Sequence, residues 1–205
     1  MVDSIKEQYI DQYKQYHSNP EKYPGNSFKN GYQHVTDLIT ETGAKTVLDY
    51  GCGKGGQYKA QKMHRAWGIG MPTLYDPAVP EFEVLPDQMF DGIYSTDVME
   101  HIPEEVIPEV FDWIFNHAEK FVFLGIATSP ARAILPNGEN AHCTVKPIEW
   151  WADRFDTLIG RGATTAVSAA DHYLDSDTHL DVTDITEQQG QLFHHNGSNW
   201  DALDP

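Results

Sequence analysis

Basic side chains are scarce in this sequence of 205 residues. It contains 14 lysine and arginine residues against 31 aspartate and glutamate residues, which gives a formal net charge of −17 at pH 7. A surface this acidic repels phosphate backbones and anionic lipid headgroups. The composition therefore argues against non-specific nucleic-acid binding and against a membrane partner, and it favours a small-molecule substrate.

Cysteine and long apolar runs are scarce as well. Cys52 and Cys143 form neither a C-x-x-C pair nor a metal-binding spacing, so no disulfide framework is expected. No apolar run approaches the roughly 20 residues of a membrane-spanning helix. The first residues also lack the basic-then-apolar order of a signal peptide. We expect a cytoplasmic protein, and the sequence carries no signal of oligomeric state.

Three segments with different patterns follow one another along the chain. Residues 1–43 contain two helical patterns and predict an N-terminal helical cap. Residues 44–170 alternate short apolar runs with helical periodicity, which predicts a Rossmann-like α/β core with a doubly wound, mostly parallel sheet. Residues 171–205 are polar and acidic, and their histidines match neither a calcium loop nor a zinc spacing. We therefore expect a loose C-terminal segment and no metal site.

The core elements can be placed from their hydrophobic period. Short apolar, β-rich runs predict four buried strands, at 45–50, 73–77, 90–97 and 120–127. Apolar residues at three- and four-residue steps predict helices, at 28–42, 57–67, 103–119 and 148–159.

The most informative stretch is TVLDYGCGKGGQ at residues 46–57, where a strand runs into an acid and four glycines. A glycine-rich turn between a strand and a helix favours a ligand site, because bare backbone approaches closely and the helix start has unpaired N–H groups. A P-loop needs Ser or Thr after its lysine, but Lys54 is followed by Gly55. The glycine spacing also fits a dinucleotide fingerprint, although Asp49 would place negative charge near a pyrophosphate.

The pattern D-x-G-x-G-x-G fits at every position, with Asp49, Gly51, Gly53 and Gly55. Here the sequence resembles the class I S-adenosylmethionine-dependent methyltransferases, whose first motif reads VLDxGCGxG. The resemblance implies a loop, Cys52 included, that binds S-adenosylmethionine through its cationic amino acid end. The product would be S-adenosylhomocysteine.

Two further blocks extend the resemblance over residues 45–127. An acid ending the second strand binds ribose hydroxyls in this family, and Asp76, followed by Pro77, takes that position. The block EVLPDQMFD implies that Glu83 and Val84 read the adenine. Only six residues separate Asp76 from Glu83, where the family inserts a helix, so either the core is trimmed or one of these acids is misassigned.

The block TDVMEHIPEE resembles a third family motif, which lies where the fourth strand of the family's sheet opens over the cofactor. The resemblance implies that residues 97–101, Asp97, Val98 and Met99 among them, line the methyl-donor pocket. In open α/β sheets, ligands bind at the carboxyl ends of the strands, which agrees with this position.

The acceptor has no motif of its own. Two segments suit a substrate pocket. One is the polar segment at residues 129–151, after the strongest predicted strand, and the other is the segment at residues 19–26, where two prolines and a glycine interrupt the helical pattern. Both equally suit ordered surface segments. The candidate acceptor contacts are Tyr23, Asn137, Asn140, His142 and Trp150. His101 and His142 are the candidate general bases, because a histidine pKa near neutrality suits removal of a proton.

These observations predict an S-adenosylmethionine-dependent methyltransferase that acts on a small molecule by in-line displacement. One alternative is a protein that binds the cofactor without transferring the methyl group, as a sensor or accessory subunit. A second alternative is an NAD-dependent oxidoreductase.

Overall fold

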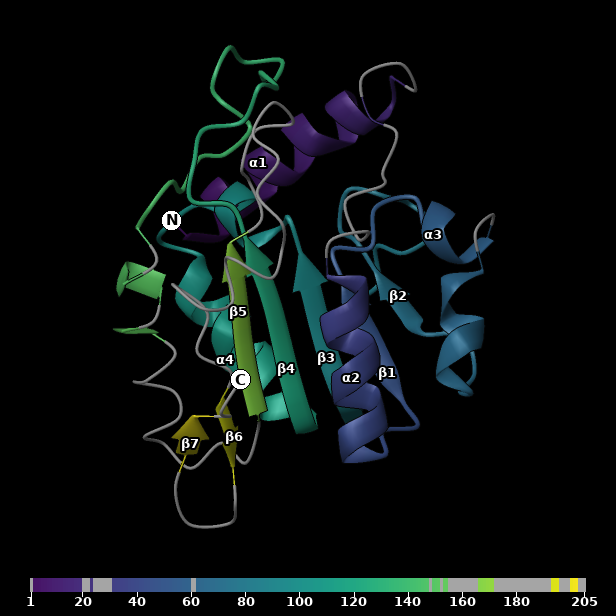
Figure 1. Cartoon of the computed structure of the whole chain (residues 1–205). Coiled ribbons are helices and arrows are strands. Elements are labelled where there is room, and N and C mark those ends of the chain that lie inside the picture. The colour runs from purple at the N-terminus through teal and green to yellow at the C-terminus, as the bar shows by residue number, and fades with distance from the viewer. Residues whose placement is uncertain are drawn as a thin grey trace.

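The computed structural model describes residues 2–19, 23, 31–59, 62–147, 149–151, 153–154, 166–171, 193–195 and 200–202. Within these residues the strands form one sheet in the order β2-β1-β3-β4-β5-β6-β7 (Figure 1). The first five strands pair in parallel, and β6 and β7 extend the sheet in antiparallel fashion. The strands are β1 (Val47–Tyr50), β2 (Thr73–Tyr75), β3 (Phe90–Thr96), β4 (Ala118–Ile126), β5 (Ala166–Asp171), β6 (Phe193–His195) and β7 (Trp200–Ala202).

Helices cover both faces of the sheet, as expected of a doubly wound fold. Figure 1 shows α2 (Tyr32–Thr42) in front of the strands and α4 (Ile107–His117) behind them. Alternate residues of β4 point to opposite faces. Val122 and Leu124 pack in the cluster that contains α4, whereas Phe121 and Phe123 pack in the cluster that contains α2. The predicted Rossmann-like α/β core is therefore confirmed.

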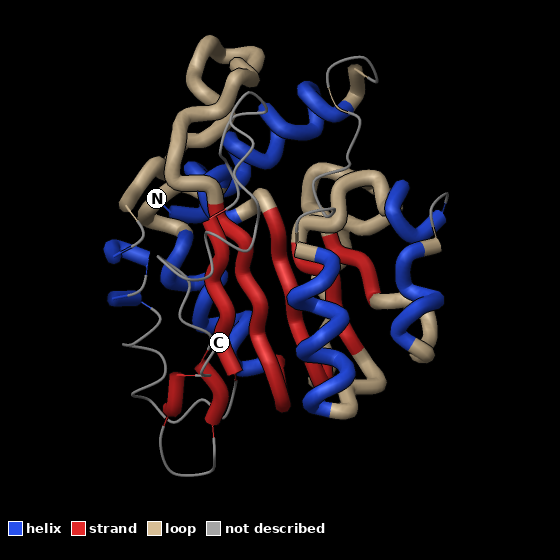
Figure 2. The backbone as a smooth tube through the Cα atoms, in the orientation of Figure 1, coloured by secondary structure: helices blue, strands red, loops and turns tan. Residues whose placement is uncertain are grey.

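The N-terminal helix α1 (Val2–His17) lies across the carboxyl ends of the strands. Figure 2 shows it as the blue helix above the red strands. None of its residues is fully buried, so it rests on the core without entering it. No helix in the described part of the chain combines the length and the apolar character needed to cross a bilayer.

Most predicted elements form near their expected positions. The four predicted strands correspond to β1 to β4, and the helix predicted at 103–119 begins at Ile107, because a turn at 104–106 precedes it. The helix predicted at 57–67 is wrong as one unit. It is divided into α3 (Gly56–Lys59) and the 3₁₀ helix η2 (Met63–Trp67), and the N-cap residue of η2, Lys62, has a left-handed φ of 55°.

The remaining predicted elements are described only in part. Residues 28–30 of the helix predicted at 28–42 and most of the segment 171–205 lie outside the described residues. Residues 149–151 and 153–154 are helical, within the helix predicted at 148–159. In the C-terminal segment, Phe193–His195 and Trp200–Ala202 form strands.

The connection from β2 to β3 is short. Residues 76–89 are all described, and they contain turns and extended chain but neither a helix nor a strand. The trimmed core that the spacing of the two acids suggested is therefore real, and β2 lies at the edge of the described sheet.

Candidate active site

A cavity of about 780 Å³ opens where the parallel strands end. Its walls come from the strand ends and the turns that follow them, the helix α1, Tyr23, the start of α4 and the segment that follows β4. Ligand sites in open α/β sheets lie at this edge, because the loops that leave the strands diverge there. The residues that carry polar chemistry or rings into it include Tyr13, Tyr16, His17, Tyr23, Asp76, Asp97, His101 and His142.

The glycine loop has the geometry that its composition predicts. Gly51, Gly53 and Gly55 have φ values of +86°, +56° and +64°, a region that residues with a Cβ rarely adopt. A Cβ at Gly51 would lie 2.3 Å from a methyl group of Val98, and one at Gly53 would lie 2.4 Å from the Tyr23 hydroxyl. Gly51 lines the cavity, whereas Cys52 is buried behind it. The loop therefore lets neighbouring side chains, or a ligand, approach the backbone directly.

Asp49 is buried, with 2% of its surface exposed, and does not line the cavity. Its carboxylate accepts hydrogen bonds from the Tyr58 hydroxyl at 2.5 Å and from Nε2 of Gln57 at 3.2 Å. Burial raises the Asp49 pKa to about 7, against the lowering effect of these two hydrogen bonds. Asp49 thus places a titrating carboxyl close to the loop.

Asp76 occupies the end of β2 and lines the cavity together with Pro77. One carboxylate oxygen accepts a hydrogen bond from the Gly53 N–H and the other accepts one from the Ala78 N–H, both at 2.9 Å. Burial raises the Asp76 pKa, and these two backbone hydrogen bonds oppose that shift. The carboxylate is therefore held rigidly between the glycine loop and the chain that leaves β2.

Glu83, the second acid that the family motifs selected, lies at the surface. Glu83 forms an exposed ion pair with Lys14 at 3.2 Å, and Val84 is 81% exposed. Neither residue is among those that line the cavity.

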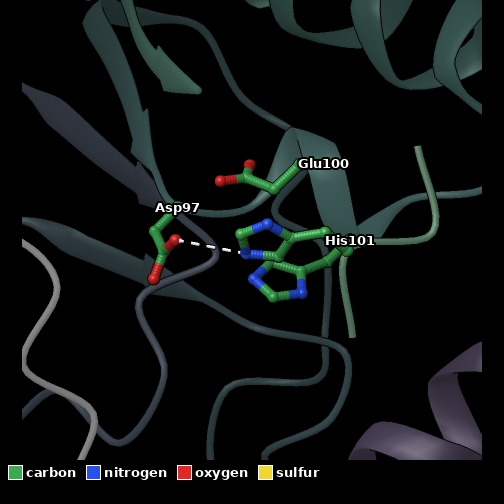
Figure 3. Close-up of side chains that lie close together, drawn as sticks. Asp97, Glu100 and His101 are labelled. Atoms are coloured by element: carbon green, nitrogen blue, oxygen red, sulfur yellow. Dashed lines mark ion pairs between the residues drawn. The ribbon is translucent and has the colours of Figure 1, made fainter. Parts of the chain in front are cut away.

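The loop after β3 turns sharply into the cavity. Asp97 has a left-handed φ of 61°, which aspartate tolerates better than most residues, and its N–H donates to the carbonyl of Gly125 at 2.9 Å. The 3₁₀ turn η3 (Met99–His101) follows. Val98 lines the cavity, whereas Met99 is fully buried in the core. This turn brings the side chains of Asp97, Glu100 and His101 together (Figure 3).

His101 and His142 meet at the cavity wall, with ring centroids 4.7 Å apart. Nδ1 of His101 lies 2.9 Å from the carbonyl oxygen of Ala141, and Nδ1 of His142 lies 2.6 Å from that of Ser129. Burial lowers the His101 pKa to about 4, so this imidazole is neutral at pH 7. The structure thus brings together both histidines that the sequence selects as candidate bases.

The segment that carries His142 is folded by its own polar side chains. Asn140 bonds to the N–H and the carbonyl of Ala131 and to the N–H of His142. Thr144 bonds through its N–H to the carbonyl of Glu100 and through its hydroxyl to that of Ile102. These bonds fasten the segment to the turn after β3.

Three of the candidate acceptor contacts lie outside the cavity lining, whereas Tyr23 and His142 are part of it. Asn140 shapes the segment from within. Asn137 accepts a hydrogen bond from the N–H of Glu139 in an exposed turn, and Trp150 packs against the core and Arg154.

Sequence reasoning assigned no separate role to Glu100 or to the tyrosines of α1. Glu100 is 0% exposed, and burial, with Asp97 nearby, raises its pKa well above the usual range. The spacing D-x-x-E-H at residues 97–101 was the available signal, because positions i, i+3 and i+4 share one side of a helical turn. Tyr9, Tyr13 and Tyr16 recur at the same spacing and line the cavity.

Comparison with known proteins agrees with this architecture. A family model described as a methyltransferase domain matches residues 14–160, which is well over half of the chain. No curated protein and no solved structure gives a significant match. The matched region contains the glycine loop, Asp76, the turn after β3 and His142. This chain belongs to the methyltransferase-domain family.

Proposed function

We propose that the protein transfers a methyl group from S-adenosylmethionine to a small-molecule acceptor. The observation that carries this proposal is the single cavity shared by the glycine loop, Asp76 and the two histidines. The glycine loop and Asp76, which suit the methyl donor, occupy one wall of this cavity. The two histidines, which are the candidate bases, occupy another. Members of this family generally use S-adenosylmethionine as the methyl donor.

The residues present fit that cofactor. Gly51 and Gly53 leave bare backbone where a Cβ would collide with its neighbours. The Asp76 carboxylate has two oxygens, each with a further lone pair, and so suits adjacent ribose hydroxyls. The stacked rings of His17 and Tyr23, 3.8 Å apart, supply flat surface for a base or for a cation.

Charge supports the same assignment. When bound, the cofactor supplies a methyl group on a positively charged sulfur. Asp76 and Asp97 line the cavity and Asp49 lies buried near the loop, whereas the lining cations Lys6 and Arg132 come from α1 and from the segment after β4. Carboxylates favour a cationic ligand with an ammonium group and disfavour a pyrophosphate. This balance favours a methyl donor over a dinucleotide, although Asp76 would suit the ribose of either.

The chain's own residues then orient the acceptor and manage its proton. The cavity volume of about 780 Å³ falls in the range of small-molecule sites, which is roughly 300–1,000 Å³. In-line displacement requires alignment of the acceptor atom, which the tyrosines of α1 and the wall after β4 would impose. His101 and His142 lie at the wall where an acceptor proton would be removed.

Thermal unfolding with added ligands tests the proposal. S-adenosylhomocysteine and S-adenosylmethionine should each raise the melting temperature, by about 5–10 °C at 100 times their dissociation constant. NAD at the same concentration should leave it unchanged. Stabilisation by NAD alone would show that the protein is an oxidoreductase. Stabilisation by the methyl donor, without turnover of any acceptor in a panel of small hydroxyl and amine compounds, would favour a silent cofactor-binding protein.

A further inference from the structure

We propose that Asp97, Glu100, His101 and His142 form a binding site for a divalent transition metal ion. Each residue offers one ligand atom, and these four atoms all lie within 4.8 Å of one another. The first three residues come from the turn after β3, and His142 comes from the segment after β4. Figure 3 shows the labelled side chains of Asp97, Glu100 and His101 close together, and its dashed line starts at Asp97, whose Oδ1 lies 3.9 Å from Nε2 of His142.

The hydrogen bonds of the two histidines fix the tautomers that a metal needs. A carbonyl oxygen only accepts, so Nδ1 of His101, 2.9 Å from the Ala141 carbonyl, carries a proton. Nδ1 of His142, 2.6 Å from the Ser129 carbonyl, carries one for the same reason. Nε2 is then the ring nitrogen that can offer a lone pair to a cation. Metal-binding histidines are typically held this way, with the second nitrogen donating to a backbone carbonyl.

The two carboxylates are incompletely satisfied without a cation. Oε1 of Glu100 accepts the Ala127 N–H at 2.8 Å, but Oε2 has no hydrogen-bond partner among the described residues. Oδ1 of Asp97 likewise has none there, and it lies 3.9 Å from Nε2 of His142. Lone pairs of two carboxylates and an imidazole therefore converge in a largely buried space. Such an arrangement requires a positive charge, either a bound cation or a proton held among the two acids and His142.

The protein holds this arrangement from several sides. The left-handed backbone at Asp97 directs its side chain inward, and Thr144 fastens the His142 segment to Glu100 and Ile102. The Tyr13 hydroxyl, 3.1 Å from Nδ1 of His101, adds a contact from α1. A shared proton needs only two neighbouring groups. A metal ion accounts for the convergence of four ligand atoms, with both histidines held through Nδ1.

The ligand set indicates the class of ion. Two imidazoles and two carboxylates suit Zn²⁺, Mn²⁺ or Fe²⁺, whereas Mg²⁺ and Ca²⁺ prefer oxygen alone. Ligand atoms about 2.1 Å from a metal lie at most about 4.2 Å apart, so the cluster needs only a small contraction. Asp97, His101 and His142 line the cavity, so coordination positions beyond the four protein ligands would face it.

If the proposed methyl transfer also holds, the ion assigns the acceptor atom. A hydroxyl oxygen in an open coordination position would become more acidic, as metal-bound water does. With His101 and His142 acting as ligands and not as bases, its proton would pass to cavity water. The freed electron pair would form the new O–CH₃ bond, and the C–S bond would break with its electrons left on sulfur. Six tyrosines line the cavity, so the acceptor class is a hydroxyl compound with an aromatic or apolar scaffold.

The test is Mn²⁺ binding to the full chain after treatment with a chelator. Binding is measured as the loss of the electron paramagnetic resonance signal of free Mn²⁺. We expect one Mn²⁺ per chain, displaced by Zn²⁺. Glu100→Gln and Asp97→Asn should each weaken binding at least about tenfold, because each removes an anionic ligand. Gln can still accept the Ala127 N–H, and Asn tolerates a left-handed φ, so both variants should fold. Glu81→Gln, a matched charge change in an exposed ion pair with Lys59, should stay within twofold of wild type.

Saturable Mn²⁺ binding that both variants weaken supports the site, and if one variant fails to fold the other decides. No saturable binding by the wild-type chain, or binding that neither variant changes, overturns it. Thermal stabilisation by S-adenosylhomocysteine in the same samples separates the two proposals. Stabilisation without Mn²⁺ binding removes the metal site alone, and Mn²⁺ binding without stabilisation removes the methyl-donor assignment alone.

Discussion

The hydroxyl of Tyr58 donates a 2.5 Å hydrogen bond to the buried carboxylate of Asp49. Asp49 precedes the glycine loop and Tyr58 follows it, so this bond closes the loop at its base. The Tyr58 hydroxyl is also bonded to that of Tyr94 on β3. The acid that marks the loop in the sequence is therefore anchored in the core, which has consequences for stability as well as for binding.

Replacing Asp49 by Asn should stabilise the protein at alkaline pH. The folded pKa of about 7 exceeds the ordinary value of 3.8, so the folded state holds this proton more tightly than the unfolded state. The resulting stability is complete below about pH 3.8 and is lost as pH rises through 7. The gap in unfolding free energy between variant and wild type should therefore widen by ~2 kcal/mol from pH 5.5 to pH 8.

Urea unfolding at several pH values measures this gap, and S-adenosylhomocysteine titration should show that the stabilised variant has lost cofactor affinity. A gap that stays constant over this pH range would mean that Asp49 does not titrate there.

Replacing Asp76 by Ala should weaken cofactor binding at least tenfold. It removes a carboxylate from the cavity wall and leaves the N–H groups of Gly53 and Ala78 without their acceptor. Two unsatisfied buried donors should also lower the free energy of unfolding by about 1–3 kcal/mol each. Calorimetric titration with S-adenosylhomocysteine measures the first effect and urea unfolding the second.

Glu83→Ala is the matched control, because this exposed acid has only the surface ion pair with Lys14. This substitution should change the dissociation constant for S-adenosylhomocysteine less than about twofold. Equal losses in the two variants would return Glu83 to the cofactor site that the sequence motif implied.

Gly51→Ala should damage the loop far more than Gly138→Ala. The two glycines have nearly the same backbone, with φ values of +86° and +89°, so the conformational cost is similar, roughly 1–2 kcal/mol. Only at Gly51 does the added Cβ collide with a neighbour, 2.3 Å from Val98, whereas nothing lies within 4 Å at Gly138.

The Gly51 variant should therefore lose stability beyond that common cost and lose S-adenosylhomocysteine binding, while the Gly138 variant keeps its affinity. Thermal unfolding with and without ligand measures both. Similar behaviour of the two variants would mean that close approach at Gly51 does not matter.

His17→Phe should make the protein less sensitive to acid. Burial lowers the His17 pKa to about 4, helped by Lys54 and His101, and the ring stacks on Tyr23. The folded pKa lies below the ordinary 6.5, so the stability from neutral His17 is present above pH 6.5 and is lost as pH falls toward 4. Phe keeps the stacked ring but cannot be protonated.

As pH falls from 7 to about 5, the free energy of unfolding of the variant should rise by roughly 1–2 kcal/mol relative to that of the wild type. Urea unfolding at the two pH values measures it. Parallel pH curves for variant and wild type would show that His17 is accessible to protons in the folded protein.

The local elements were predictable because their causes are local. The short apolar runs at β1, β3 and β4 and the glycines at 51, 53 and 55 specify buried strands and a left-handed turn from adjacent residues alone. The exception is the helix predicted at 57–67. Helical composition there did not reveal the break between Lys59 and Met63, where Lys62 takes a left-handed conformation.

The candidate site was predictable only in part. Family motifs selected both Asp76 and Glu83, yet the short connection after β2 directs one carboxylate into the cavity and the other to the surface. Asn140 was selected as an acceptor contact for its polar group and Trp150 for its ring, but composition does not distinguish a side chain that shapes a segment from one that faces a cavity.

The sequence by itself determined the α/β class, the glycine loop and the family, because these depend on short-range periodicity and on backbone conformations that glycine alone adopts readily. Only the tertiary structure decided that His142 meets Asp97, Glu100 and His101, and that α1 covers the strand ends with its tyrosines. The physical reason is the parallel sheet. It gathers the loops after β2, β3 and β4 at one edge, so residues far apart in the chain share one cavity.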